Sequence, residues 1–356
     1  MTITLNVDPK NPDKSKIAKA AEIIRRGGIV VFPTETVYGI GANAFDPKAC
    51  RKIYAIKRRA ADNPLIVHVS SMDMANAVAK IPDKYKRILK RIWPCPLTVV
   101  AKSRDSVPKV VTGGLNTVSV RMPQNRVALR LIEESGVPIA APSANISKRP
   151  SSTSASHAKK YFDGAVDAII DAGSSRFGIE STIIDTGNFT LLRPGAFTLA
   201  QIEKEFGKKP RITDESMGLK YAQRPKSPGT KYAHYSPLTP LFLFDGNVKS
   251  LKKATSVFKG RFVFIGSSES CRALRENAKR TIDLGKRGEM RKIAHNLFHS
   301  LILLDSLNAD FAITEGFSEH GMGLAIMNRL RKASGNRSFE SEKELRILVG
   351  GIRCTP

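Results

Sequence analysis

Short apolar segments alternate with amphipathic segments along most of this 356-residue chain, and this alternation limits the fold more than any other feature. Runs such as Gly28–Pro33, Leu65–Ser70 and Leu97–Ala101 have the length of buried strands. Residues 14–28 and 47–58 instead read as amphipathic helices. Polar residues follow the ends of several predicted strands. The pattern predicts an α/β protein, in which strand ends commonly carry ligand-binding groups.

The alternation is interrupted once, between residues 207 and 240, where Lys, Pro, Gly and Tyr are frequent. Residues 1–206 therefore form one predicted domain of mixed α/β type. Residues 241–356 alternate strand and helix in the way that predicts a smaller, Rossmann-like parallel sheet. The intervening residues hold three tyrosines and His234, which favours an ordered linker that acts as a lid over a plain flexible one.

The chain is strongly basic, with 58 lysines and arginines against 32 acidic residues and a formal net charge of +26. This surplus favours polyanionic partners, although a general bias toward lysine explains it as well. No apolar run approaches the roughly 18 residues of a membrane helix, and the N-terminus lacks a signal-peptide core. We expect a cytoplasmic protein without membrane contact. The four scattered cysteines predict neither a disulfide nor a metal site.

Basic and carboxamide groups gather in two short segments. Lys57 and Arg59 end a predicted helix beside Asn63, which precedes a proline, and Ser143-Ala-Asn145 leaves a later strand. Neither GxxxxGK[ST] nor GxGxxG occurs, so side chains would have to hold any nucleotide. A guanidinium can bind phosphate oxygens in a fork, and a solvated basic surface is the alternative interpretation.

Arg121 interrupts the apolar strand Val118–Met122, where a charge needs a partner. The partner could be a carboxylate-bearing ligand or an Asp or Glu from a neighbouring segment. His68 lies within the predicted strand Leu65–Ser70, where a histidine satisfied inside the protein is the alternative to a binding role.

Taken in order, these motifs resemble the YrdC-type threonylcarbamoyl-AMP synthases, in the longer, two-domain branch of that family. The matching segments are Pro33-Thr-Glu-Thr36-x-Tyr38-Gly39, Lys57-x-Arg59, Asn63-Pro-Leu-Ile-Val-His68, Pro96-Leu-Thr98, Val120-Arg121, Ser143-x-Asn145, Glu180-Ser-Thr182, Leu192-Arg-Pro-Gly195, Ser227–Pro237 and Asn328–Ala333. The resemblance covers nearly the whole chain. It implies a YrdC-like twisted mixed sheet with helices around a basic concave cavity for residues 1–206, followed by the linker and the Rossmann-like domain.

The resemblance implies a nucleotidyltransferase that makes L-threonylcarbamoyl-AMP from L-threonine, bicarbonate and ATP and releases pyrophosphate. Mg²⁺ would accompany ATP, without a tightly bound cofactor. A tRNA threonylcarbamoyl transferase complex would then use the product to form threonylcarbamoyladenosine in tRNA, and a weak direct tRNA contact is compatible with the charge. The alternative is an RNA-binding module without catalysis, although the basic residues are not interleaved with stacking aromatics.

Matched position by position, the resemblance implies catalytic roles for Lys57, Arg59, Ser143 and Asn145. It implies that ATP is bound by Arg59, Asn63, Thr117, Ser143, Ser151, Arg193 and Tyr232. It implies that threonine is bound by Thr36, His68, Arg121, Ala141 and Ser181. The chain departs from the family where Arg58, Cys95 and Lys148 replace common glycines, Ala60 a common proline and Thr230 a common methionine. We expect these departures to affect fine geometry and rate.

Overall fold

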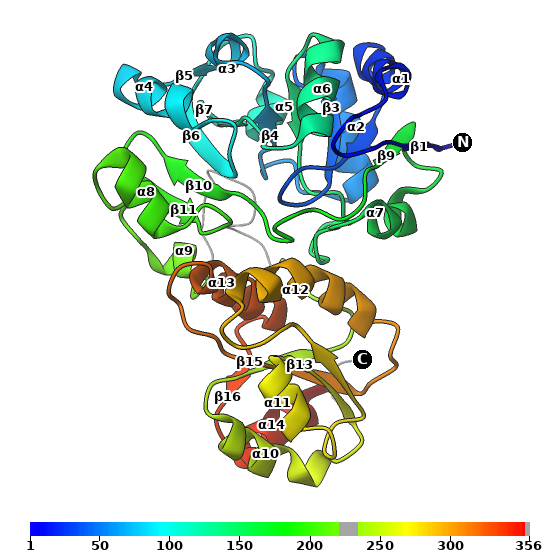
Figure 1. Cartoon of the computed structure of the whole chain (residues 1–356), viewed down its shortest axis with the longest axis vertical. Coiled ribbons are helices and arrows are strands. Elements are labelled where there is room, and N and C mark those ends of the chain that lie inside the picture. The colour runs from blue at the N-terminus through cyan, green and yellow to red at the C-terminus, as the bar shows by residue number, and fades with distance from the viewer. Residues whose placement is uncertain (221–233, 353–356) are drawn as a thin grey trace. The chain divides into compact units, whose positions relative to one another are not determined.

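The computed structural model describes residues 1–220 and 234–352, which divide into two compact units. Among these residues, the first unit comprises 1–147 and 151–220. The second unit comprises 148–150 and 234–352. Each unit has its own sheet (Figure 1). Residues 221–233, which include Tyr232 and Thr230, lie outside the described residues. The lid, and the boundaries 1–206, 207–240 and 241–356, therefore stay predictions.

The first unit is built on a mixed sheet, in the strand order β1-β9-β2-β3-β8-β4-β7-β6-β10-β11 with β5 beside β6. The strands are β1 (Ile3–Asn6), β2 (Val30–Phe32), β3 (Gly39–Asn43), β4 (Ile66–His68), β5 (Ala79–Lys80), β6 (Leu97–Ser103), β7 (Thr117–Arg121), β8 (Ile139–Ala141), β9 (Ala168–Asp171), β10 (Thr182–Asp185) and β11 (Thr190–Arg193). β7 pairs in parallel with β4 and antiparallel with β6. The predicted mixed sheet is confirmed.

Helices α1 (Lys14–Arg25) and α6 (Arg126–Ser135) pack against each other and share a core with part of this sheet (Figure 1). Alternate strand residues such as Val30 and Phe32 enter this core because successive side chains of a strand point to opposite faces. The Asp13 carboxylate accepts hydrogen bonds from the first backbone N–H groups of α1 and so fixes its start. The remaining helices of the unit are α2 (Pro47–Lys57), α3 (Met72–Val78), α4 (Asp83–Ile92), α5 (Lys109–Thr112), α7 (Ala155–Phe162), α8 (Leu199–Phe206) and α9 (Asp214–Met217).

The second unit has a five-stranded parallel sheet in the order β14-β13-β15-β12-β16. Its elements are β12 (Leu241–Phe244), α10 (Val248–Thr255), a 3₁₀ turn (Ser256–Phe258), β13 (Phe262–Gly266), α11 (Ser268–Ala273), β14 (Arg280–Asp283), α12 (Met290–Leu304), β15 (Phe311–Glu315), α13 (Gly323–Ser334), β16 (Ser338–Phe339) and α14 (Glu342–Ile352). Phenylalanines from β12, β13 and β15 share a core with α10, α11 and α14, whereas α12 and α13 lie together (Figure 1). The Rossmann-like parallel sheet is confirmed.

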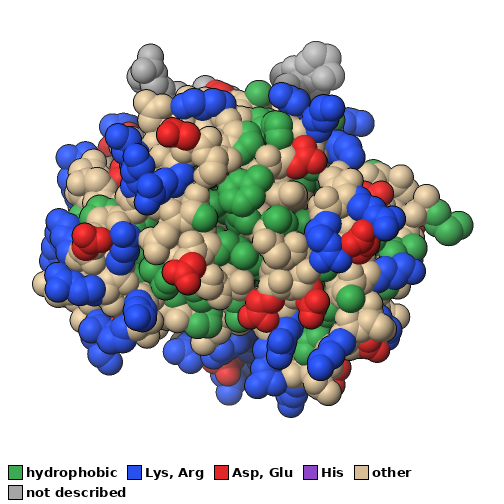
Figure 2. Space-filling view, turned by 90° about the horizontal axis from the view of Figure 1, so that it is seen from above, with side chains coloured by type: hydrophobic (Ala, Val, Ile, Leu, Met, Phe, Trp, Pro, Cys, Tyr) green, Lys and Arg blue, Asp and Glu red, His purple; other side chains and the backbone are tan. Residues whose placement is uncertain are grey.

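The basic surplus is spread over the surface. Figure 2 shows lysine and arginine side chains in many groups on the visible face, separated by acidic and apolar side chains. A cavity of about 480 Å³ beside α1 and α6 is lined mainly by charged residues, namely Lys10, Lys14, Arg126, Arg130, Glu133 and Glu134. Among the helices in the described ranges, none has the length and hydropathy needed to cross a bilayer.

Two of the departures from the resembled family occupy left-handed backbone positions. Arg58 follows the last residue of α2 with φ 51° and ψ 48°, and Lys148 has φ 72°. A side chain with a Cβ atom is disfavoured in this region by about 1–2 kcal/mol, whereas glycine is not. The glycines common at these positions in the family therefore match the backbone that this chain adopts.

We predict that Arg58→Gly raises the free energy of unfolding by about 0.5–1 kcal/mol. The free energy gained by relieving the backbone strain should exceed the free-energy cost of the extra conformational entropy that glycine gives the unfolded chain. Urea denaturation measures the change. Arg26 follows α1 with φ −80°, so Arg26→Gly is the matched control and should lower stability. Equal changes in the two variants would contradict the role assigned to the backbone angle.

Candidate active site

Three neighbouring strands bring His68, Arg121 and Thr98 into one row. The parallel pairing of β4 with β7 sets His68 opposite Arg121, and the antiparallel pairing of β6 with β7 sets Thr98 opposite Arg121. Residues opposite each other on adjacent strands point to the same face of a sheet. All three side chains are buried. The register thus brings together two residues predicted from the sequence and one, Thr98, that was not selected as a site residue.

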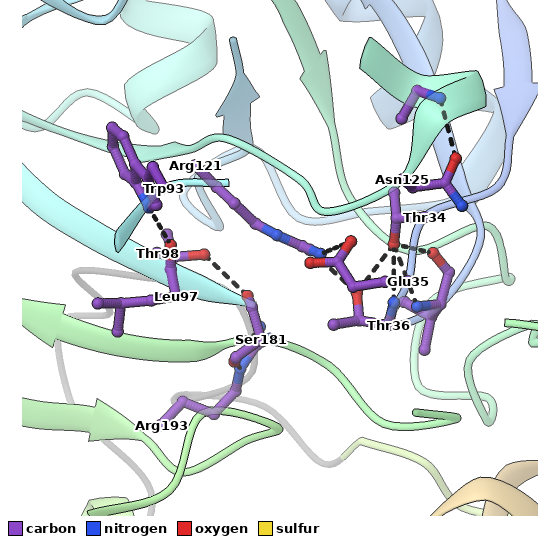
Figure 3. A network of polar contacts seen from close by, with 12 residues as sticks. Thr34, Glu35, Thr36, Trp93, Leu97, Thr98, Arg121, Asn125, Ser181 and Arg193 are labelled. Atoms are coloured by element: carbon purple, nitrogen blue, oxygen red, sulfur yellow. Dashed lines mark hydrogen bonds and ion pairs between the residues drawn. The ribbon is translucent and has the colours of Figure 1, made fainter. Parts of the chain in front are cut away.

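Arg121 extends from its strand toward the turn between β2 and β3, as Figure 3 shows. Its Nη2 lies 2.6 Å from Glu35 Oε2, and its Nη1 donates to Thr36 Oγ1 at 3.0 Å. Thr34 Oγ1 lies 2.9 Å from Thr36 Oγ1 and donates to the Val37 carbonyl oxygen. Of the two kinds of partner that the sequence allowed for Arg121, the structure shows a glutamate from a neighbouring segment.

Ser181 extends the polar row beyond Thr98. The Oγ atoms of Thr98 and Ser181 are 2.8 Å apart, because β10, which follows Ser181, pairs in parallel with β6 (Figure 3). Arg193, at the end of β11, donates from Nε and Nη2 to the Ser181 carbonyl oxygen at 3.2 and 3.0 Å. Ala141 ends β8 opposite Ile66 of β4, two residues along that strand from His68, which is paired with Ile139. The residues predicted to bind threonine therefore gather around one region of the sheet.

His68 is held in its neutral form. Burial, followed by the nearby positive charge of Arg121, lowers the pKa of His68 to about 3. Its Nδ1 lies 3.2 Å from the Ile66 carbonyl oxygen, which can only accept, so the proton of the neutral ring belongs on Nδ1. The ring meets Phe32 edge-on at 5.9 Å between centroids. At neutral pH, Arg121 is therefore the cation of this row.

Lys57 holds the loop that follows β8. Its Nζ donates to the carbonyl oxygens of Ser143, at 2.5 Å, and Asn145. Ser143 Oγ donates to Asn145 Oδ1 at 2.5 Å, and the backbone N–H of Ser147 donates to the Lys57 carbonyl oxygen at 3.0 Å. Burial, and then the charge of Arg59, lowers the pKa of Lys57 well below its usual value. The structure thus brings Lys57, Ser143 and Asn145 together.

The remaining residues predicted to bind ATP belong to other sets of hydrogen bonds. Arg59 donates from Nη2 to Asn63 Oδ1 at 2.6 Å and to the Pro64 carbonyl oxygen at 2.8 Å. Ser151 Oγ donates to Glu180 Oε1 at 2.6 Å. Thr117 begins the strand that ends at Arg121. Glu180 directly precedes Ser181, which places the contact of Ser151 next to the polar row.

Comparison with known proteins finds the same family along most of the chain. Residues 22–195 match the family Sua5_yciO_yrdC, described as "Telomere recombination". Residues 197–335 match the family Sua5_C, described as "Threonylcarbamoyl-AMP synthase, C-terminal domain". Proteins named threonylcarbamoyl-AMP synthase are 45% identical in Pyrococcus abyssi and 40% identical in Bacillus subtilis. The first alignment covers 95% of this chain and 99% of the relative, and the second covers 93% and 96%.

A solved structure of Pyrococcus abyssi Sua5 complexed with L-threonine is also similar, with a TM-score of 0.88 and 43% identity. The superposition covers 95% of this chain and 99% of that one. The chain belongs to the Sua5/YrdC family of threonylcarbamoyl-AMP synthases. It is accordingly an enzyme that forms an AMP-linked intermediate, by a reaction of the nucleotidyltransferase type.

The buried neutral His68 should make stability depend on pH. Its folded pKa of about 3 lies below the ordinary 6.5, so between these values the unfolded chain binds a proton that the folded chain does not. Stability therefore falls as the pH is lowered from 6.5 toward 3, by at most about 1.4 kcal/mol per pH unit from this group. We predict a shallower fall for His68→Gln in urea denaturation across this range. A His68→Gln slope equal to that of the wild type would contradict the prediction.

Proposed function

We propose that this enzyme synthesises L-threonylcarbamoyl-AMP from L-threonine, bicarbonate and ATP and releases pyrophosphate. The observation that carries the proposal is the buried row of His68, Arg121 and Thr98, with the hydroxyls of Thr36 and Ser181 beside it. A guanidinium can bind the carboxylate of an amino acid, and the hydroxyls can bind a hydroxylated side chain. A relative's structure with L-threonine supports the same substrate.

The residues that the family resemblance assigns to ATP hold the nucleotide, and their side chains take the place of a glycine-rich loop. ATP contacts Arg59, Asn63, Thr117, Ser143, Ser151 and Arg193. Lys57 and Asn145 keep the Ser143 loop in shape through the contacts of the Lys57 ammonium. A role for Tyr232 rests on the family resemblance alone. The guanidinium groups of Arg59 and Arg193 offset the negative charge of the phosphates.

Mg²⁺ enters with ATP as part of the substrate. Among residues 1–220 and 234–352 there is no group of three or more His, Cys, Asp or Glu side chains that could hold a metal ion. Mg²⁺ keeps several water ligands and commonly binds substrate phosphates with few protein ligands. The phosphates and water would then provide most of its coordination.

The chemistry needs orientation more than a protein nucleophile. The amine of threonine takes up carbon dioxide derived from bicarbonate and becomes a carbamate. A carbamate oxygen attacks the α-phosphorus of ATP, the bond from that phosphorus to the bridging oxygen breaks, and pyrophosphate leaves. Arg193, proposed to contact ATP, donates to the carbonyl oxygen of Ser181, proposed to contact threonine, and this contact supports such a transfer. In the cytoplasm, a tRNA threonylcarbamoyl transferase complex would consume the product.

Pyrophosphate release tests this proposal. The purified protein is mixed with ATP, Mg²⁺ and bicarbonate, with and without L-threonine. We expect release only when threonine is present, together with threonylcarbamoyl-AMP detected by mass spectrometry. Release that is indifferent to threonine would overturn the substrate assignment, and RNA binding without release would favour the non-catalytic alternative.

Substitution of Arg121 should weaken threonine binding. Loss of a buried, charge-assisted partner costs on the order of 2–5 kcal/mol, so Arg121→Ala should lower the affinity at least about 30-fold in calorimetry. Arg121→Lys keeps the charge but loses the planar fork, and it should fall between the wild type and the alanine variant. Unchanged threonine affinity in a folded Arg121→Ala protein would contradict this role.

Substitution of Lys57 should reduce turnover through the loop that it holds. Lys57→Met leaves the Ser143 and Asn145 carbonyl oxygens without their ammonium donor, so we expect pyrophosphate release to fall more than tenfold. Lys52→Met is the matched control, because Lys52 lies on the same helix and donates to the Gly27 carbonyl oxygen away from the site. Full activity in Lys57→Met, or equal losses in both variants, would contradict a specific role for Lys57.

A further inference from the structure

Glu35 is a buried carboxylate with unmet hydrogen-bonding capacity. It is 2% exposed, and both carboxylate oxygens are without a hydrogen-bond donor among the described residues. Oε2 lies 2.6 Å from Arg121 Nη2, so the charges meet, but the contact lacks the direction of a hydrogen bond. Leaving buried polar groups in this state costs free energy, and each such group calls for an explanation, which can be a missing partner.

Arg121 has the complementary deficit. Its Nη1 is satisfied by Thr36 Oγ1, whereas Nε and Nη2 have no hydrogen-bond acceptor in the described part of the chain. These two nitrogens form one edge of the guanidinium, and this edge can bind a carboxylate in a fork. The site therefore presents unsatisfied donors of a cation directly beside unsatisfied acceptors of an anion.

This pair of deficits fits a zwitterion. An α-amino acid carries its carboxylate and its ammonium on the same carbon atom, so a binding site for both needs a cation and an anion close together. Arg121 and Glu35 meet this requirement, and Figure 3 shows the two groups tip to tip beside Thr36. The alternative, that Glu35 only neutralises Arg121, leaves the idle acceptors of Glu35 unexplained. The burial of both groups strengthens discrimination, because water cannot replace a missing ligand group there.

We propose that Glu35 binds the α-ammonium of the amino-acid substrate and so restricts this site to zwitterions. The assignment rests on the proposed function, because it places threonine against Arg121. In this arrangement the carboxylate of threonine lies on the Nε–Nη2 edge of Arg121, and its ammonium donates to Glu35. Glu35 selects for the amino group that must be present for carbamate formation.

Calorimetry with two ligands tests the assignment. (R)-3-Hydroxybutanoate keeps the carboxylate and hydroxyl of L-threonine but has hydrogen in place of the ammonium. The wild type should bind L-threonine at least about 30-fold more tightly than this analogue, the loss expected when a buried charged group is left without its partner. In Glu35→Gln, threonine affinity should fall tenfold or more while the analogue binds no worse, so the ratio approaches one.

The control is Glu315→Gln, because Glu315 is equally buried and pairs with Arg287 in the other unit. In this control, the ratio of the affinity for L-threonine to the affinity for (R)-3-hydroxybutanoate should equal that of the wild type. An unchanged ratio in Glu35→Gln, or equal losses for both ligands, would overturn the role of Glu35 while leaving the proposed function intact. Equal binding of both ligands by the wild type would overturn it even if Glu35→Gln failed to fold. Absence of threonine binding to the wild type, with or without ATP, would overturn the proposed function as well.

Discussion

A guanidinium enclosed within a β-sheet must be compensated, and the first unit is arranged around this requirement. Removing a charge from water is costly unless an opposite charge and hydrogen bonds replace the solvent. Glu35 supplies the charge and Thr36 a hydrogen bond, both from the turn that follows β2. Burial lowers the pKa of His68, and the adjacent charge of Arg121 acts in the same direction, so His68 adds no second cation to this region. The strand register gathers polar side chains in this buried region, and some of their donors and acceptors have no hydrogen-bond partner among the described residues.

The residues carried over from the family divide into groups that act on a ligand and groups that act on the protein. Lys57 belongs to the second kind, since its ammonium binds two carbonyl oxygens of the loop after β8. Arg193 holds the Ser181 carbonyl oxygen beside the polar row, and the role proposed for it toward ATP would place it in both groups. The proposed nucleotide site, built from side chains, would thus depend on a scaffold of buried polar and charged groups, where a glycine-rich loop would use backbone N–H groups.

Much of the fold follows from local sequence signals. The run Val118–Met122 and the helix spacing of residues 14–28 match β7 and α1, since period and capping act within a few residues. β3, with the sequence GIGAN, was not predicted because its glycines are typical of turns, and its pairing with β2 and β8 stabilises it.

The sequence indicates a site residue where a charged side chain interrupts an apolar strand, as Arg121 does. Glu35 and Thr98 were not selected as site residues. Thr98 lies beside Arg121 only through strand pairing, and Glu35 reaches Arg121 from a turn that precedes it by 86 residues. Periodicity carries no signal for such contacts. The Pro-Thr-Glu-Thr and Pro-Leu-Thr motifs contain both residues, so motif membership was the one sequence signal that could have identified them.

The order of strands in the first sheet has a consequence for how this enzyme matures. β1 pairs with β9, and the polar row joins strands that begin at residues 66, 97, 117 and 182. Contacts that span such long stretches of chain form late and slow folding. A growing chain therefore has no amino-acid site until Ser181 has been added and the sheet has closed around it. From that moment the proposed substrate can bind, and its binding stabilises the finished fold by mass action.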